Sequence, residues 1–200
     1  MDTEYRTKTG WLCLDFANTM EWHASNSPVE TLNSYADLIE WSVDRGIVPG
    51  DAKDALLRKS EERPVEAQAV LYKARETRED IYQILSDTAH GKPIETSELK
   101  GFNKALASAL SHSKLAPSEG GLKWEWDSHP DKLDSVLWPV VKSAVDLMTS
   151  DAIRRVGQCA DERGCGWLFW DSSRNRSRRW CDMSDCGNRA KVRRFYAKKR

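Results

Sequence analysis

Residues 159–200 read CADERGCGWLFWDSSRNRSRRWCDMSDCGNRAKVRRFYAKKR, and this stretch holds four of the five cysteines of the chain. The cysteines form two close pairs, Cys159 with Cys165 and Cys181 with Cys186, and fifteen residues separate the pairs. Four thiolates arranged in two pairs can surround one Zn²⁺ as a tetrahedron, and the separation lets the chain fold back on itself. The spacing therefore predicts one structural zinc ion bound by these four cysteines.

Both pairs are wider than the C-x₂-C of the commonest zinc ribbons, so the spacing alone does not decide for zinc. Disulfides are the alternative use of these cysteines. A segment of this size is too small to stabilise itself without a metal or disulfides. The first ten residues, MDTEYRTKTG, do not resemble an export signal, and no run of the chain approaches 18 apolar residues. We therefore expect a soluble cytoplasmic protein with reduced thiols and no membrane association, which favours zinc.

The charge of the chain is divided between its two parts. Residues 151–200 contain fourteen Lys and Arg against six Asp and Glu, a net charge of +8. The whole chain has 31 of each kind, so residues 1–150 carry 17 against 25, a net charge of −8. This asymmetry predicts an anionic partner, such as nucleic acid, for the basic C-terminal part.

The run at residues 167–194, WLFWDSSRNRSRRWCDMSDCGNRAKVRR, closely resembles the CGNR zinc finger, named for the tetrapeptide found here at residues 186–189. The run LCLDFANT at residues 12–19 resembles the opening motif of the ABATE domain, which such proteins usually carry at the N-terminus. The resemblance implies a bacterial stress-induced transcription regulator whose N-terminal domain senses a small ligand or makes protein contacts. One departure is the first cysteine pair, whose five intervening residues slightly exceed the expected spacing.

Hydrophobic periodicity predicts an α+β protein in which residues 1–150 form a mainly helical domain with a small β-sheet. Short apolar or alternating runs at residues 11–17 and 122–126 are expected to be strands that pair with each other. The fifth cysteine, Cys13, lies in the first of these runs and is interpreted as a buried small hydrophobe. Helices are expected at residues 31–45 with Thr31 as cap, after residues 49–51 to about 62, at 64–90, from a cap at Thr96 or Ser97 to about 113, and at 131–148.

Residues 151–200 are expected to form a four-cysteine zinc finger whose order of elements is similar to a treble clef. Cys159 and Cys165 would form a knuckle, residues 167–170 a strand, and residues 171–178 the tip of a hairpin. Trp180 and Cys181 would return along the second strand. Cys186 would lie in the first turn of a terminal helix that places Val192, Phe195 and Tyr196 on one face and cations on the other.

Cations from the hairpin tip and the terminal helix are the candidate nucleic-acid contacts, because one metal would fix both elements. A basic helix with small residues between its cations can approach a phosphate backbone or enter a major groove. The alternative is a solvated basic tail. The candidate residues are Arg174, Asn175, Arg176, Arg178, Arg179, Arg189, Lys191, Arg193, Arg194 and Lys198.

The sequence offers no set of residues for catalysis. The four histidines are scattered, and the chain contains neither a nucleophile elbow nor a phosphate-binding glycine loop. Four cysteines also fill the zinc tetrahedron, whereas a catalytic zinc keeps one position open. The sequence thus predicts a zinc-dependent regulator that binds double-stranded DNA, with a small-molecule effector and a homodimer left open. An RNA-binding module and a structural or protein-interaction finger are the alternatives.

Overall fold

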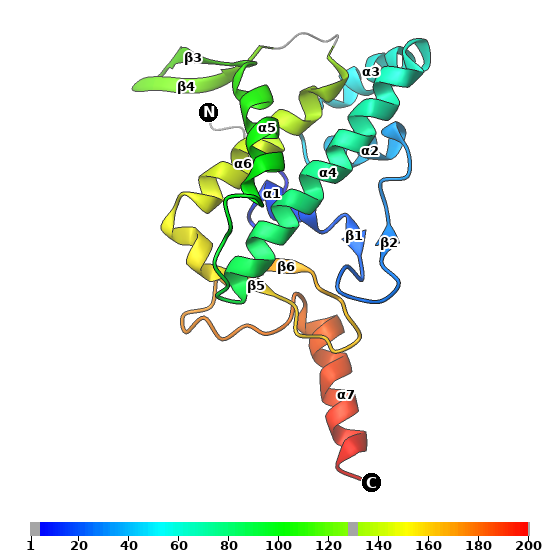
Figure 1. Ribbon diagram of the computed structural model, residues 1–200, viewed down its shortest axis with the longest axis vertical. Helices are drawn as coiled ribbons and strands as arrows, with labels where there is room; N and C mark the ends of the chain where they lie inside the picture. Colours follow the sequence, from blue (N-terminus) through cyan, green and yellow to red (C-terminus); the bar gives the residue numbers. More distant parts are fainter. Residues whose placement is uncertain (1–4, 128–131, 200) are drawn as a thin grey trace.

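The computed structural model describes residues 5–127 and 132–199 and shows a helical body from which the C-terminal helix projects (Figure 1). The helices are α1 (Leu12–Ala17), α2 (Tyr35–Asp44), α3 (Lys53–Glu62), α4 (Pro64–Ala89), α5 (Leu99–Leu110), α6 (Trp138–Met148) and α7 (Asn188–Ala197). The strands form three antiparallel pairs: β1 (Met20–Glu21) with β2 (Val29–Glu30), β3 (Ser113–Ser118) with β4 (Gly121–Trp126), and β5 (Val156–Gln158) with β6 (Leu168–Trp170). Among the described helices, none combines the length and apolar character that a membrane crossing requires.

Helix α4 is the central element of the body. It begins with Pro64 in its first turn and packs against α1, α2, α5 and strand β5. Its buried side chains recur at helical spacing, as with Leu71, Ala74 and Ile81, which lie in the main apolar core. The predicted helix at residues 64–90 is therefore confirmed, and so is the helix that ends at Glu62.

The prediction of a strand at residues 11–17 is wrong, because residues 12–17 form helix α1. All six residues of this helix are buried, so its sequence carries no amphipathic period and cannot be told from a buried strand. The carboxylate of Asp15 accepts hydrogen bonds from the backbone N–H groups of Lys8 and Thr9, at 2.6 and 2.9 Å, which ties the preceding segment to the helix. Cys13 is buried as predicted, and burial raises the pKa of its thiol to about 12.

Strand β4 is confirmed, but its partner is β3 and not the N-terminal run. The register places Ser118 opposite Gly121, so Glu119 and Gly120 form a two-residue hairpin loop. Gly120 has a φ of +83°, which this short loop requires and which favours glycine. The segment between the expected helix and the expected strand is therefore largely the first strand of a hairpin.

The predicted helix caps are also corrected. Helix α2 is capped by Ser34, whose side chain accepts from the Asp37 N–H while Asp37 accepts from Ser34 in return; Thr31 instead bonds to the Thr19 carbonyl. Helix α5 begins after Glu98, and neither Thr96 nor Ser97 caps it. A 3₁₀ turn, Leu133–Leu137, precedes α6, and the predicted start at residue 131 lies outside the described residues.

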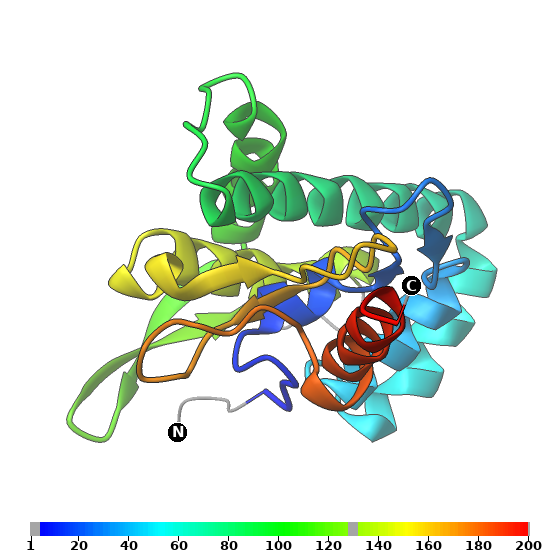
Figure 2. The same cartoon turned by 90° about the horizontal axis from the view of Figure 1, so that it is seen from below.

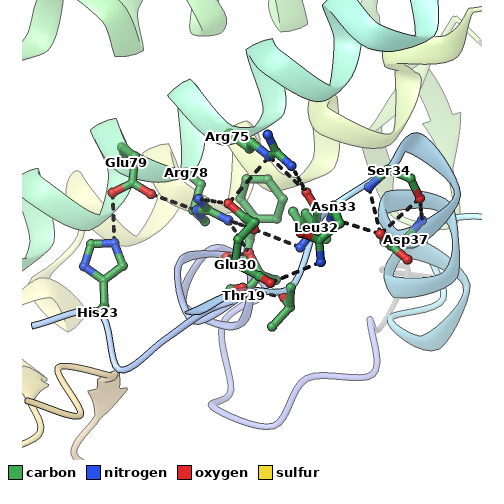
Figure 3. A network of polar contacts seen from close by, with 12 residues as sticks. Thr19, His23, Glu30, Leu32, Asn33, Ser34, Asp37, Arg75, Arg78 and Glu79 are labelled. Carbon is green, nitrogen blue, oxygen red and sulfur yellow. Dashed lines mark hydrogen bonds and ion pairs between the residues drawn. The ribbon is translucent and has the colours of Figure 1, made fainter. Parts of the chain in front are cut away.

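A buried arginine on α4 holds the β1–β2 segment against the body (Figure 3). The side chain of Arg78 is 2% exposed and forms two parallel hydrogen bonds with Glu30, Nη1 to Oε1 at 2.6 Å and Nη2 to Oε2 at 2.7 Å. Its Nε donates to Glu79 at 2.9 Å. Bidentate pairs of this kind fix orientation as well as distance, so strand β2 is held at a defined position on α4.

The same network reaches the C-terminal part of the chain. Glu79 Oε2 lies 2.8 Å from His23 Nε2, and the His23 ring is tilted by 31° against the Tyr82 ring with 3.4 Å between centroids. The backbone N–H of His23 donates to the carbonyl of Cys165 at 3.1 Å. The ion network of the helical body thus positions a loop that contacts one of the predicted zinc ligands.

Candidate zinc centre and nucleic-acid interface

The first cysteine pair lies at the end of the β5–β6 hairpin. Cys159 directly follows β5, and Cys165 lies shortly before β6. The strand predicted at residues 167–170 is confirmed as Leu168–Trp170. Between the two cysteines, the Gly164 N–H donates to the Asp161 carbonyl at 2.9 Å and closes a turn. The predicted return strand at Trp180 and Cys181 is wrong, because β6 pairs with β5, with Val156 opposite Trp170.

The chain leaves the hairpin after β6 because Asp171 turns it. The buried carboxylate of Asp171 accepts from the backbone N–H groups of Ser173 at 2.8 Å and Arg178 at 2.9 Å. Such local bonds compete with strand pairing and favour a loop. Residues 171–180 therefore form a loop fixed at its base, and the bond from Ala160 N–H to the Arg179 carbonyl, 2.9 Å, links it to the knuckle backbone.

The second cysteine pair precedes and begins the terminal helix. Asp182 accepts hydrogen bonds from the backbone of Ser184 and Asp185, at 2.6 and 3.1 Å, and caps a short π-helical turn at Met183–Gly187 that leads into α7. Cys186 lies in this turn, which confirms its expected place at the start of the helix. The order of knuckle, strand and terminal helix is that of a treble-clef-like finger.

The four sulfurs of Cys159, Cys165, Cys181 and Cys186 lie within 4.8 Å of one another. Cys181 Sγ is 3.7 Å from Cys165 Sγ and 3.6 Å from Cys186 Sγ. A tetrahedron of sulfurs bound to Zn²⁺ at about 2.3 Å has edges of about 3.8 Å, so the cluster has the dimensions of a zinc site. None of the five cysteines is in a disulfide. The donor set fits one structural Zn²⁺.

The thiols of the cluster strongly influence one another's protonation. Hydrogen bonds from the Cys165 and Cys181 thiols lower the pKa of Cys159 to about 2, while the bonds with Cys159 raise the pKa of both partners. Burial raises the pKa of Cys186 to about 12. Negative charge on all four sulfurs therefore needs a cation, which a bound Zn²⁺ would supply, because metal binding displaces thiol protons.

A layer of charged residues surrounds the cluster. The Arg189 Nη2 donates to Cys186 Sγ at 2.7 Å, and its Nε donates to Asp161 at 3.0 Å. The Asp161 side chain is fully buried and also accepts from Arg193 Nη1 at 3.0 Å. Burial alone would raise the pKa of Asp161, but the bonds from the Arg163 backbone, Arg189 and Arg193 hold it below its usual value. The knuckle and α7 are thus joined by an ionised carboxylate as well as by the cysteines.

Two glycines press the knuckle against the N-terminal domain. Gly164 and Gly166 have φ angles of +88° and +69°, in the left-handed region that favours glycine. A Cβ on Gly164 would lie 2.6 Å from the Ser25 Cα, and one on Gly166 would lie 2.6 Å from the Ala24 nitrogen. The Gly166 carbonyl accepts from Tyr82 Oη at 3.0 Å. The backbones of the knuckle and of the N-terminal domain are therefore in direct contact, and the finger is packed against that domain.

A buried asparagine joins the helical domain to strand β6. Asn18 Nδ2 donates to the Leu168 carbonyl at 2.8 Å, and Asn18 Oδ1 accepts from the Leu168 N–H at 2.8 Å. Leu168 and Val156 belong to the main apolar core of the body. The hairpin that carries the first cysteine pair is thus built into the helical domain.

Replacing Asn18 with leucine is expected to destabilise the protein by about 2–5 kcal/mol, since it leaves the buried N–H and C=O of Leu168 without partners. Urea unfolding at neutral pH measures this change. Replacing the exposed Asn33, whose side chain donates to the Glu30 carbonyl, should cost less than about 1 kcal/mol and is the matched control. Equal stabilities of the two variants would contradict the assigned role of Asn18.

Comparison with protein families gives two matches that together span nearly all of the chain. The ABATE model, described as "Putative stress-induced transcription regulator", matches residues 10–151, which is more than half of the sequence. The chain belongs to the ABATE family. The CGNR zinc finger model matches residues 155–199. Both are regulator and zinc-finger types of family, not enzyme families, and comparison with curated proteins finds no match.

Eight of the ten predicted nucleic-acid contacts are exposed on the CGNR finger, and seven of these eight form one group. Within residues 5–127 and 132–199, the side chains of these seven make no ion pair or hydrogen bond. Two of them, Arg179 and Arg194, approach the Trp180 ring at 5.3 and 6.0 Å from its centroid, so this ring links the loop to α7. The seven residues are Arg174, Asn175, Arg176, Arg179, Lys191, Arg194 and Lys198.

The side chains of the other three predicted contacts form hydrogen bonds with groups of the finger itself. Arg178 donates to the carbonyls of Trp180 and Cys181. Arg189, the arginine of the CGNR tetrapeptide, binds Asp161, Asp185 and the Cys186 sulfur, and also approaches the Trp22 ring of the ABATE domain at 5.3 Å. Arg193 is bound to Asp161. These three arginines are therefore placed to hold the finger together.

Helix α7 leaves its apolar face uncovered. Val192, Phe195 and Tyr196 are 47%, 55% and 65% exposed, whereas Ala190 is buried against the finger. The three residues share a face, as predicted. The sequence-based interpretation missed the roles of Asp161, Asn18 and Trp22, and the one available signal was an acidic residue two positions after a zinc ligand.

Proposed function

We propose that the chain is a zinc-dependent transcription regulator that binds double-stranded DNA through its CGNR finger. The observation that carries this proposal is a set of seven exposed polar and cationic residues on two segments that meet at the cysteine cluster. Among the described residues, their side chains make no ion pair or hydrogen bond. Cations held on a rigid frame can neutralise several phosphates at once, which supplies most of the affinity for duplex DNA.

Some arginines of the finger are bound within it and others face solvent, and this division supports the proposed function. Arg189 and Arg193 bind Asp161, which fixes α7 against the knuckle, so the remaining cations are presented at defined positions. Arg174 and Arg176 lie on the loop between β6 and Cys181. Arg194 lies on α7, which projects from the body (Figure 1), and Lys198 directly follows that helix. Phosphate contacts from both elements would orient α7 on the duplex, and its exposed side chains could then reach base edges.

The affinity for a DNA duplex is expected to fall steeply with salt. If about six phosphates are neutralised, the slope of log K against log salt should be about −5. Replacing exposed Arg194 with alanine should reduce the steepness by about one unit. Replacing Arg193 should leave the slope unchanged, because that guanidinium is already bound to Asp161 and Glu162.

Fluorescence anisotropy titrations of the zinc-loaded protein at several salt concentrations measure these slopes. The Arg193 variant is the matched control, since it has the same charge change one residue away. A slope near zero for the parent chain would count against nucleic acid as the partner. Tighter binding of single-stranded RNA than of duplex would support the alternative in which the exposed Phe195 and Tyr196 rings stack on bases.

A small-molecule effector would bind in the ABATE domain under this proposal. A cavity of about 550 Å³ lies between α4 and the turn before α6, and its lining includes Lys73, Lys132, His112 and Asp134. Its volume is within the range of ligand pockets, and its charged side chains would favour a polar ligand. Such a ligand could regulate DNA binding only if its affinity differed between two arrangements of the chain.

A further inference from the structure

The β3–β4 hairpin exposes an apolar face. Its register places Leu115 opposite Trp124 and Pro117 opposite Leu122, so these side chains share one face of the ribbon. Leu115, Leu122 and Trp124 are 58%, 69% and 52% exposed. The hairpin projects from the helical body in both views (Figures 1 and 2). A projecting two-stranded ribbon with an apolar face is marginal on its own and indicates a surface that another strand covers.

The open edge of this ribbon is β4. The Asp127 N–H donates to the His112 carbonyl at 2.7 Å, which fixes the alternation of hydrogen-bonded pairs along the hairpin. By that alternation, Leu122, Trp124 and Trp126 direct their backbone N–H and C=O groups away from β3. The outer edge of β3 is different, because Pro117 lies on it and has no N–H to donate. A further strand would therefore add to β4.

A groove runs along this edge. It has a volume of about 1300 Å³ and is lined by all six residues of β4 but only two of β3, Leu115 and Ser118. The opposite wall includes Trp11 from the segment before α1 and Pro139 from α6. The groove thus has the apolar side chains of Trp11 and Pro139 on one side and, on the other, β4 backbone groups that pair with no other backbone group of the described residues. Extended strands join sheets at edges of this kind.

We propose that β4 of a second copy of this chain occupies the groove and pairs antiparallel with β4 about a two-fold axis at Trp124. In this register Leu122 lies opposite the partner's Trp126, and Trp124 lies opposite the partner's Trp124. All of these residues have outward-facing backbone groups, so the hydrogen bonds of the new ladder match without a bulge. The two hairpins form one four-stranded sheet with a continuous apolar face.

The charges of β4 select this register. On the polar face, Lys123 lies opposite the partner's Glu125, and the symmetry repeats the pair. Within its own hairpin Lys123 stands opposite Ala116, whereas Glu125 stands opposite Lys114 with 3.5 Å between Nζ and Oε2. In the dimer Glu125 would therefore lie between two lysines.

Shifted registers lose this match. A shift of two residues in one direction places Lys123 opposite the partner's Lys123, and a shift in the other direction places Glu125 opposite the partner's Glu125. Directly opposed like charges are destabilising in a sheet. A shift by one residue mismatches the directions of the backbone groups and turns the apolar side chains to the polar face. The sequence LKWEW at residues 122–126 is thus self-complementary in one antiparallel register.

This dimer is independent of the proposed DNA binding and is tested by charge reversal in the full-length, zinc-loaded chain. Sedimentation equilibrium should show a dimer for the parent protein at micromolar concentration. Lys123→Glu and Glu125→Lys should each weaken self-association by about tenfold or more. In either homodimer, both pairs of residues 123 and 125 then carry like charges. Lys104→Glu, on the exposed side of α5, is the matched control and should dimerise as the parent does.

The decisive sample is an equimolar mixture of the Lys123→Glu and Glu125→Lys chains. In the heterodimer both opposed pairs again carry opposite charges, so native mass spectrometry should show heterodimers in excess over either homodimer. Circular dichroism of each variant confirms that the fold is retained. A monomeric parent chain at tens of micromolar, or a mixture that forms no heterodimer, would overturn the proposal.

Discussion

Replacing Cys186 with serine is expected to remove zinc from the protein and to unfold α7. Structural zinc contributes on the order of 10–16 kcal/mol in small fingers, because the site forms only in the folded state. Cys186 Sγ lies 3.6 Å from Cys181 Sγ and accepts from Arg189, so its loss breaks the metal site and the link from knuckle to α7. The helical body should remain folded, since its core is built mainly from α1, α4, α5 and α6.

Metal analysis after dialysis against a weak chelator measures the zinc content, and amide hydrogen exchange reports on α7 and α4 separately. The Cys13→Ser protein is the matched control, because Cys13 is buried in α1 away from the cluster. It should keep one zinc per chain, whereas the Cys186→Ser protein should keep none. Unchanged zinc content in the Cys186→Ser protein would contradict the assigned ligand set.

Replacing Arg78 with methionine is expected to destabilise the fold by about 3–5 kcal/mol, because it removes the bidentate partner of the partly buried Glu30 carboxylate. That carboxylate then keeps only Arg75 at 3.5 Å and the Leu32 N–H at 2.8 Å. Adding Glu30→Gln should restore part of that loss, since the uncompensated charge is then removed. Urea unfolding at neutral pH gives the three free energies. A double variant less stable than Arg78→Met alone would show that the uncompensated charge of Glu30 is not the cause.

Acid should also affect the parent more than the Arg78→Met variant. Burial raises the pKa of Glu30 and Glu79, but the bonds from Arg78 and His23 hold both pKa values below the ordinary value. A depressed pKa contributes stability above the unfolded pKa of about 4.3, and that stability is lost as the pH falls toward the lower folded value. The stability difference between parent and variant should therefore shrink as the pH falls below about 4.3.

The predicted helices were those with a clear period, and the errors lie where local sequence carries no period. Helix α4 has buried positions at a regular spacing and a proline at its start, and these two signals suffice to predict the helix. Helix α1 is buried on every side, so its six residues read equally well as a strand. The sequence does not reveal strand β3, because Pro117 interrupts the alternation of apolar and polar residues. In addition, only two residues separate β3 from its partner β4.

The sequence predicts the metal ligands of the candidate site but not the ion pairs and hydrogen bonds around them. Cysteine spacing identifies the metal cluster because four thiolates have few other uses in a reduced protein. The roles of the arginines depend on where Asp161 lies after folding, and Asp161 is far from Arg189 and Arg193 in sequence. Sequence alone therefore could not separate the arginines that hold the finger together from those that face solvent.

The central claim is that the zinc-loaded finger binds duplex DNA, and a competition experiment at moderate salt tests it most directly. A labelled duplex selected from a random-sequence pool would be displaced by unlabelled selected duplex, unrelated duplex, single-stranded DNA and a structured RNA. Specific duplex binding predicts that the selected duplex competes best, by about a thousandfold or more over unrelated duplex, and that chelation of zinc abolishes binding. Equal competition by single strands or RNA, or binding that survives loss of zinc, would contradict the account.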